Sequence, residues 1–359
     1  MVDFSSLDPL DPLVSLGQYS EAGGYISGAL ISGQSTSSAE TLPRAQFDSS
    51  APANSDPRAA DFTSGVALDD PLLYDDGPSD EVDAGTLHKF VDDVKKWLRQ
   101  WVEQGSNPYI HRHLYHDHLP REIQDVYTCC AAYFAKTPTN SGMVLRIVED
   151  RVTAMLEGQP DSPTPLSLFQ HLARVHALFT YQVIRLFDGN IRQRALAEQH
   201  ATILNTWVQE MWECFHLSGL DVYHGRSSNT PERLRRQQQQ QMMDSPSVSP
   251  IWTAWYMTES VRRTWITVRV TQSVYNTMKG GISVCPGWTA LTVDRDVWAA
   301  PSAYRWAQAC KSHNRHIAQS GELQSLILHA RASDVDDFVK VMMFFLHRRE
   351  TVERWIDET

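Results

Sequence analysis

The chain has 359 residues and a formal net charge of −11 at pH 7, and 42% of its residues are hydrophobic. It contains no apolar run of about 18 residues, which excludes a membrane-spanning segment. Asp3, Asp8 and Asp11 interrupt its start, which excludes a secretory signal. The five cysteines are odd in number and scattered, so reduced thiols in a nuclear or cytosolic protein are favoured over a disulfide framework or a zinc knot.

The negative charge is concentrated in residues 1–85, which carry fifteen acidic side chains and two basic ones. The remaining 274 residues carry 28 acidic and 30 basic side chains and are close to neutral. The first part is also rich in Ser, Gly and Pro and has no Trp or Cys. It offers too little apolar surface to offset the entropy of folding, and we therefore expect a disordered acidic arm over residues 1–85.

Two short apolar groups lie among the acids of this arm, one near its start and one near its end. Mixed acidic and apolar residues are typical of disordered transcriptional activation segments, because the charge keeps the apolar side chains solvated until a groove on a partner binds them. The alternative is a solubilising tail without a partner. The partner-binding candidates are Leu68, Leu72, Leu73 and Tyr74, flanked by Asp69, Asp70, Asp75 and Asp76.

Residues 86–347 are helical in period almost throughout, and we find no convincing alternating strand. The fold class expected is therefore all-α, a multi-helix bundle, followed by a C-terminal tail at residues 348–359. Gly and Pro residues set several helix ends. Helices are predicted over Leu87–Val102, Glu122–Lys136, Asn140 to Gly158, Leu166–Phe187, 191–217, Ser249–Pro250 to Lys279, 302–312, 319–330 and 334–347.

Between the two halves of this body, residues 229–249 combine three arginines, five consecutive glutamines and several serines. We expect an exposed loop here. Three arginines are few for a phosphate-binding site or a nuclear import signal, so a solvated surface is the favoured interpretation.

Four histidines in the stretch His-Arg-His-Leu-Tyr-His-Asp-His form the most prominent chemical cluster. His111, His113, His116 and His118 could ligate zinc or copper, with Asp117 as an orienting or ligating carboxylate. Their spacing matches no standard zinc pattern, and no Glu stands in a HExxH frame. A polar connection between helices is therefore favoured, and no metal or cofactor is predicted.

Other catalytic signatures are missing from the sequence. It holds no GxSxG, GxGxxG or GxxxxGK[ST] motif, and an all-helical body lacks the strand-to-turn geometry that these motifs require. Cys129 and Cys130 are adjacent on a helix and point in different directions, so each is expected to be a small buried residue rather than half of a redox pair. An enzyme is not expected.

A series of motifs resembles the C-terminal regulatory region of fungal zinc-cluster (Zn2Cys6) transcription factors. Ile110–Tyr115, Ile123–Asp125 and Tyr181–Arg194 fit the same region, so the resemblance covers roughly residues 88–346. The main motifs are Trp-Tyr-Met-Thr-Glu-Ser-Val-Arg-Arg-Thr-Trp (255–265), Val-Tyr-Asn-Thr-Met-Lys-Gly-Gly (274–281), Cys-Pro-Gly (285–287) and Leu-Thr-Val-Asp-Arg-Asp-Val-Trp-Ala-Ala-Pro-Ser-Ala (291–303).

The chain departs from this family at its start. Such factors usually begin with a six-cysteine cluster that binds two zinc ions and places a helix in the major groove of DNA, whereas the first cysteine here is Cys129. No zinc-ligating or DNA-binding residue can be transferred. A shortened gene model, with the six cysteines encoded upstream, is one explanation.

The resemblance implies a nuclear transcriptional regulator or co-regulator that controls a fungal metabolic, or secondary metabolite, gene cluster. Its partners would be the transcription machinery and a DNA-bound zinc-cluster factor, with a homo- or heterodimer as a further option. Fifteen acids would repel the DNA backbone, so direct DNA binding is disfavoured. The alternative is a helical metal-binding or ligand-binding enzyme-like protein that uses His111 to His118.

Overall fold

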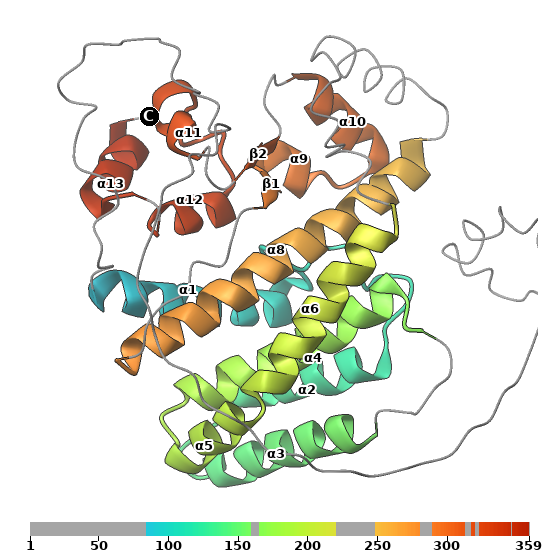
Figure 1. Cartoon of the computed structure of the whole chain (residues 1–359), viewed down its shortest axis with the longest axis vertical. Helices are drawn as coiled ribbons and strands as arrows, with labels where there is room; N and C mark the ends of the chain where they lie inside the picture. Colours follow the sequence, from blue (N-terminus) through green and yellow to red (C-terminus); the bar gives the residue numbers. More distant parts are fainter. Residues whose placement is uncertain are drawn as a thin grey trace, which may run out of the picture. The chain divides into compact units, whose positions relative to one another are not determined.

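The structure is a computed structural model that describes residues 84–158, 165–219, 248–280, 289–312, 317–319, 323–345 and 347–358. The acidic arm up to residue 83 and most of the 229–249 segment lie outside the described residues. The described part is all-α, as the sequence predicts (Figure 1). Its helices are α1 Ala84–Gln104, α2 Arg121–Phe134, α3 Ser141–Glu157, α4 Leu168–Phe187, α5 Ile191–Gln199, α6 Ala201–Leu217, α8 Val248–Met278, α9 Arg295–Ala299, α10 Ala303–Ser312, α11 Gln324–His329, α12 Asp337–Met343 and α13 Arg349–Glu358.

Helix α1 buries the apolar stripe that its three- and four-residue spacing predicts. Phe90, Val94, Trp97 and Trp101 all lie on its buried face. The helix ends at Gly105, whose φ of 69° is in the left-handed region and whose N–H donates to the carbonyl of Trp101 at 2.8 Å. Glycine adopts this conformation without a Cβ penalty, which explains why the helix stops there.

Helix α4 occupies the middle of the bundle, as its mostly apolar sequence predicts. Every residue from 172 to 185 is buried. The helix begins with a capping box, in which the Ser167 hydroxyl accepts from the Gln170 N–H while the Gln170 side chain accepts from the Ser167 N–H. It packs against α2 and α6, and an ion pair between Arg174 and Glu210 joins it to α6.

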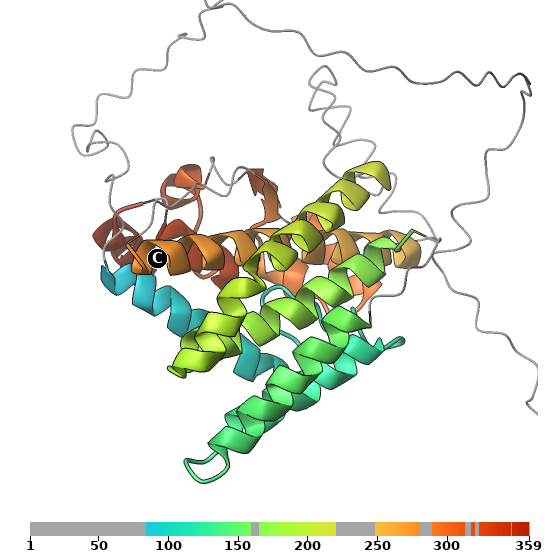
Figure 2. The same ribbon diagram turned by 60° about the horizontal axis from the view of Figure 1, so that its bottom comes forward.

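Helix α8, 31 residues long, crosses the body between two groups of elements. It contacts α1, α4 and α6 as well as α10 and the strand β1 (Ala290–Thr292). Figures 1 and 2 show it running between helices α2 to α6 and the C-terminal elements. Residues 257–268 are buried without interruption, so more than three turns of this helix have no solvent-facing side.

Several boundaries differ from the predicted ones. Residues 191–217 form two helices because the chain turns at His200, whose N–H donates to the carbonyl of Ala197 at 3.1 Å. Helix α8 begins at Val248, so Ser249 and Pro250 are inside its first turn rather than at its N-cap. Helix α11 is shorter than the predicted 319–330.

The structure also contains elements that the sequence does not reveal. Strands β1 and β2 (Ile317–Gln319) form a two-stranded antiparallel ladder, with Leu291 opposite Ala318. Three residues are too few to show an alternating pattern, which explains why no strand is predicted. The expected tail at 348–359 holds α13, whose Val352 and Trp355 are buried in the core. None of the described helices combines the length and apolarity needed to cross a membrane.

Candidate functional site

The motif at residues 255–265 places three charged side chains inside the protein. Glu259, Arg262 and Arg263 lie on α8 at i, i+3 and i+4, and each is at most 1% exposed. Oxygen Oε2 of Glu259 accepts from Arg262 at 2.8 Å, and Oε1 accepts from Nε of Arg263 at 2.9 Å. The i, i+3 and i+4 spacing therefore brings both guanidinium groups to one carboxylate on the same helix.

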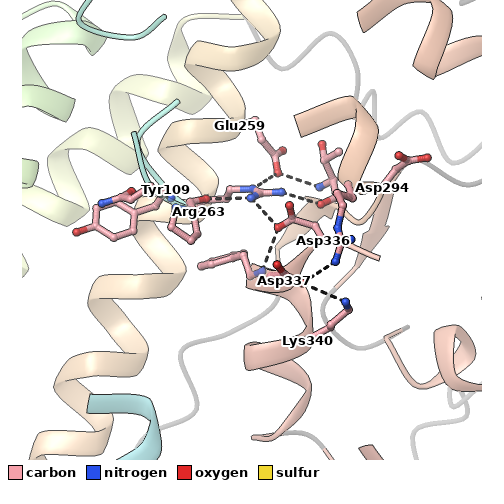
Figure 3. A network of polar contacts seen from close by, with 12 residues as sticks. Tyr109, Glu259, Arg263, Asp294, Asp336, Asp337 and Lys340 are labelled. Atoms are coloured by element: carbon pink, nitrogen blue, oxygen red, sulfur yellow. Dashed lines mark hydrogen bonds and ion pairs between the residues drawn. The ribbon is translucent and has the colours of Figure 1, made fainter. Parts of the chain in front are cut away.

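Arg263 also connects α8 to three segments that are distant in sequence. Its Nη1 donates to Asp336 and to the carbonyl of Pro108, both at 2.9 Å, and its Nη2 donates to the carbonyl of Thr292 at 3.0 Å. Figure 3 shows this side chain extending from α8 between Glu259 and Asp336. The guanidinium therefore joins α8, β1, the start of α12 and the connection between α1 and α2.

The acidic partners are themselves held by backbone groups. The N–H of Thr292 donates to Glu259 at 2.9 Å. Asp336 is the N-cap of α12 and accepts from the N–H of Phe338 at 3.1 Å, while its own N–H donates to the carbonyl of Val293 at 2.8 Å. The ring of Trp298 lies 3.9 Å from the Arg263 guanidinium carbon and covers one of its faces.

The two carboxyls have different electrostatic environments. Burial alone would raise the pKa of Glu259, but Arg262, Arg263 and the Thr292 N–H lower it to about 2. Burial raises the pKa of Asp336, because Arg263 offsets desolvation only in part and Asp337 is adjacent. Glu259 is therefore an ionised carboxylate between two cations.

This charge network fixes elements in place and has no open position for a substrate. The side-chain atoms of Glu259 and Arg263 are fully buried, and their hydrogen-bonding groups are used by other parts of the chain. The buried carboxylates and guanidinium groups therefore neutralise one another's charge and align α8, β1 and α12. The sequence reveals the Glu259–Arg263 pair from its spacing, but Asp336 is 73 residues from Arg263 and carries no local signal of the contact.

The four histidines of the 111–118 stretch do not converge on one point. His111 is buried and its ring stacks on Tyr256 with centroids 4.8 Å apart. His113 is hydrogen-bonded to the carbonyl of Pro301 at 3.3 Å, and exposed His116 pairs with Asp117 at 2.6 Å. The ring of His118 instead packs near Phe169, with centroids 5.6 Å apart.

Residues 111–118 therefore form a connection between helices that aromatic packing holds in place. Burial, together with electrostatic repulsion from the neighbouring basic side chains, lowers the pKa of His111 to about 3, so its ring is neutral. Among the described residues, no three His, Cys, Asp or Glu side chains are grouped to hold a metal ion. The arrangement therefore gives no support to the metal-site alternative.

The other candidate residues divide between buried positions and segments outside the described residues. Cys129 and Cys130 are buried free thiols, as predicted, and burial raises the pKa of Cys130 to about 12. Such thiols are poor nucleophiles. The partner-binding candidates Leu68, Leu72, Leu73 and Tyr74 lie outside the described residues.

A cavity between α4, α6 and α8 is not predicted from the sequence. It has a volume of about 170 Å³, and its lining combines apolar side chains with polar and charged ones, namely Gln182, Glu198, Asn205, Thr271, Gln272, Asn276 and Lys279. The sequence carries no local signal of it, because Gln182 is one of several polar residues, with Thr180 and Arg185, in the apolar run of α4. A polar residue at a central bundle position needs a hydrogen-bonding partner.

Fold and site together define an all-α protein whose core is fixed by buried charges. No model of a known protein family matches the chain, and no solved structure matches it. A similar curated protein is "Transcription factor gsfR2" of Penicillium aethiopicum, which is 28% identical over 255 residues. The alignment covers 71% of this chain and 58% of that relative, so the chain spans less than two thirds of the relative's length.

Proposed function

We propose that the chain is a fungal regulator of transcription that acts through protein partners. The observation that carries this proposal is the similarity to a fungal transcription factor over 71% of the chain. The motifs at 255–265 and 291–303, which resemble the regulatory region of zinc-cluster factors, supply Glu259, Arg263 and Thr292 of the buried network. Both observations support a regulatory body of that family.

The finer parts of the proposal concern place and partners. The protein acts in the nucleus, on a metabolic or secondary metabolite gene cluster. It binds the transcription machinery and a DNA-bound zinc-cluster factor, and it forms a homo- or heterodimer. The 359 residues carry a net charge of −11. Contact with DNA is therefore assigned to the partner, because a negative chain is repelled by the phosphate backbone.

The acidic arm has the recruiting role in this proposal, and a reporter fusion tests it. Residues 1–85 joined to a foreign DNA-binding domain are expected to activate a reporter gene. Replacing Leu68, Leu72, Leu73 and Tyr74 together by Ala is expected to remove most of the activation, because apolar anchors between acidic residues provide the contact with a partner groove. Reporter output at equal protein level is the measurement.

The matched control replaces four apolar residues of the same arm that are not embedded among acids, namely Tyr25, Ile26, Leu30 and Ile31. This control is expected to retain activation. If the unaltered arm does not activate, the recruiting role is wrong. If both quadruple variants lose activation equally, overall hydrophobicity rather than the 68–74 segment is responsible.

A further inference from the structure

Helix α3 has an outer side that the other described elements leave exposed. It packs chiefly on α2, and Figure 1 shows it at the lower edge of the helical body. Met143 and Ile147, one turn apart on this side, are 67% and 42% exposed, and α3 is the only one of the described helices with two large exposed apolar side chains. Ala154, about two turns further along, is also exposed. The three residues form an apolar stripe along the outside of α3.

The charged residues of α3 differ in whether they have a partner. Glu149 forms an ion pair with α5 at 2.6 Å, and Arg151 forms one with α2 at 3.7 Å, so the charges that face neighbouring helices are paired. Arg146 and Asp150 are exposed, lie one turn apart and border the apolar stripe on the same side. Neither of them has an ion-pair partner among the described residues. The stripe is therefore flanked by one free cation and one free anion of the described chain.

The order of these two charges is self-complementary. When two copies of α3 pack antiparallel about a two-fold axis near the middle of the helix, Arg146 of each copy lies opposite Asp150 of the other. Met143 of each copy then lies beside Ala154 of the other, whose small side chain leaves room for it, and the two Ile147 side chains meet near the axis. A parallel arrangement would put the charged borders of the two stripes on opposite sides of the contact, where these charges could not pair.

We propose that the outer side of α3 is a homodimer surface, on which a second copy of this chain binds with its own α3 antiparallel. The inference rests on the proposed function, because it assigns the homodimer named there to a particular surface. A contact centred on one pair of 17-residue helices is at the small end of the range of specific interfaces. The dimer is therefore expected to be weak, with a dissociation constant on the order of 10 μM.

Complementary charge reversals test this arrangement in the full-length chain. Arg146→Asp puts acids opposite acids, and Asp150→Arg puts basic groups opposite basic groups. Each variant alone is therefore expected to dimerise at least about tenfold more weakly than the unaltered chain. An equimolar mixture of the two should dimerise about as tightly as the unaltered chain, because opposite charges then meet at both contacts. Sedimentation velocity at protein concentrations from about 1 to 200 μM gives the dissociation constants.

A third variant and two controls separate the α3 surface from general surface effects. Met143→Gln removes apolar area from the contact and is expected to weaken dimerisation several-fold. Leu328→Gln changes an apolar side chain of similar exposure on α11, and Arg305→Asp reverses an exposed charge on α10. Both controls should dimerise like the unaltered chain. Circular dichroism verifies that each variant is folded.

The inference is overturned if the unaltered chain dimerises and both α3 charge variants dimerise as tightly as Arg305→Asp. The homodimer of the proposed function would then stand, on a different surface. The inference is also overturned if the mixture of charge variants associates no more tightly than each variant alone. A monomer at every concentration would overturn both this surface and the homodimer, whereas recruitment by the acidic arm is decided separately by the reporter fusion.

Discussion

Arg263 shows how a single side chain can hold several elements. Its planar guanidinium donates through three nitrogens to four acceptors, the carboxylates of Glu259 and Asp336 and two backbone carbonyls, while an aromatic ring covers its face. A lysine at this position has three donors on one atom and cannot reproduce the fork. The choice of arginine is therefore a requirement of the geometry and not only of the charge.

Neutralising Glu259 is expected to be strongly destabilising. Glu259→Gln keeps the shape but leaves Arg262 and Arg263 buried without their shared counter-charge, which typically costs about 3–5 kcal/mol in free energy of unfolding. Chemical denaturation monitored by circular dichroism measures the change. Asp337→Asn is the matched control, because this carboxylate pairs with Arg295 and Lys340 at the surface and its side chain is 77% exposed, so its loss should be close to neutral. Equal losses in the two variants would contradict the assigned role of burial.

The same residue predicts a pH dependence with a definite sign. The pKa of Glu259 falls from 4.5 to about 2 on folding, so its stabilisation is complete above pH 4.5 and is lost as the pH falls toward 2. The shift corresponds to roughly 3 kcal/mol. Asp336 has a raised pKa, so the folded protein takes up its proton more readily than the unfolded chain does. Its contribution to stability therefore rises as the pH falls, opposite to that of Glu259.

Urea unfolding measured between pH 5 and pH 2 is therefore expected to show a falling stability that is much flatter in Glu259→Gln. In Asp336→Asn the fall should be steeper than in the unaltered chain, because the opposing group is gone. If the stability of Glu259→Gln falls between pH 5 and pH 2 as steeply as that of the unaltered chain, other carboxyl groups cause the loss of stability in acid.

At the scale of elements, the C-terminal helix is part of the core. Helix α13 inserts Val352 and Trp355, and the indole N–H of Trp355 donates to the carbonyl of Ala330 at 2.9 Å. The contact ties the end of the chain to the residue that follows α11. The predicted tail at 348–359 is thus corrected, because two buried side chains, together with Ile356 packed against the same core, dock a short helix whose other residues are polar.

Truncating Trp355 tests this docking. Trp355→Ala should lower the free energy of unfolding by about 3–5 kcal/mol, since it removes a large buried side chain and leaves the Ala330 carbonyl without its donor. Its neighbour Arg354 is exposed, and Arg354→Ala should change stability by no more than about 0.5 kcal/mol. Thermal unfolding compares the two. A change as small in Trp355→Ala as in the control would show that α13 does not stabilise the body.

At the scale of the whole molecule, the sequence predicts what depends on local periodicity. The stripe of α1, the buried run of α4 and the stop at Gly105 follow from residues within a few turns of one another. Contacts between distant segments are not encoded in a local pattern. The pairing of Arg263 with Asp336 and the ladder of β1 with β2 belong to this second kind.

The candidate sites divide in the same way. The helical spacing of Glu259 and Arg263 is readable, whereas the spread of the four histidines depends on how the 111–118 connection packs against Tyr256 and Phe169. The cavity is visible only once α4, α6 and α8 are placed together, since neither Gln182 nor Gln272 contains information about the other.

The long sequence separations in the charge network have a kinetic consequence. Arg263 is 155 residues from Pro108 and 73 from Asp336, so closing these contacts requires large loops to be ordered first. We expect contacts of this kind to form after the main barrier to folding and to act as a latch against unfolding. Asp336→Asn retains a good N-cap for α12 while losing the ion pair. In stopped-flow experiments Asp336→Asn should unfold faster than Asp337→Asn, while the two variants fold at nearly the same rate. If Asp336→Asn folds more slowly instead, these contacts are already formed in the transition state. The network would then determine chiefly how long the folded body persists once formed.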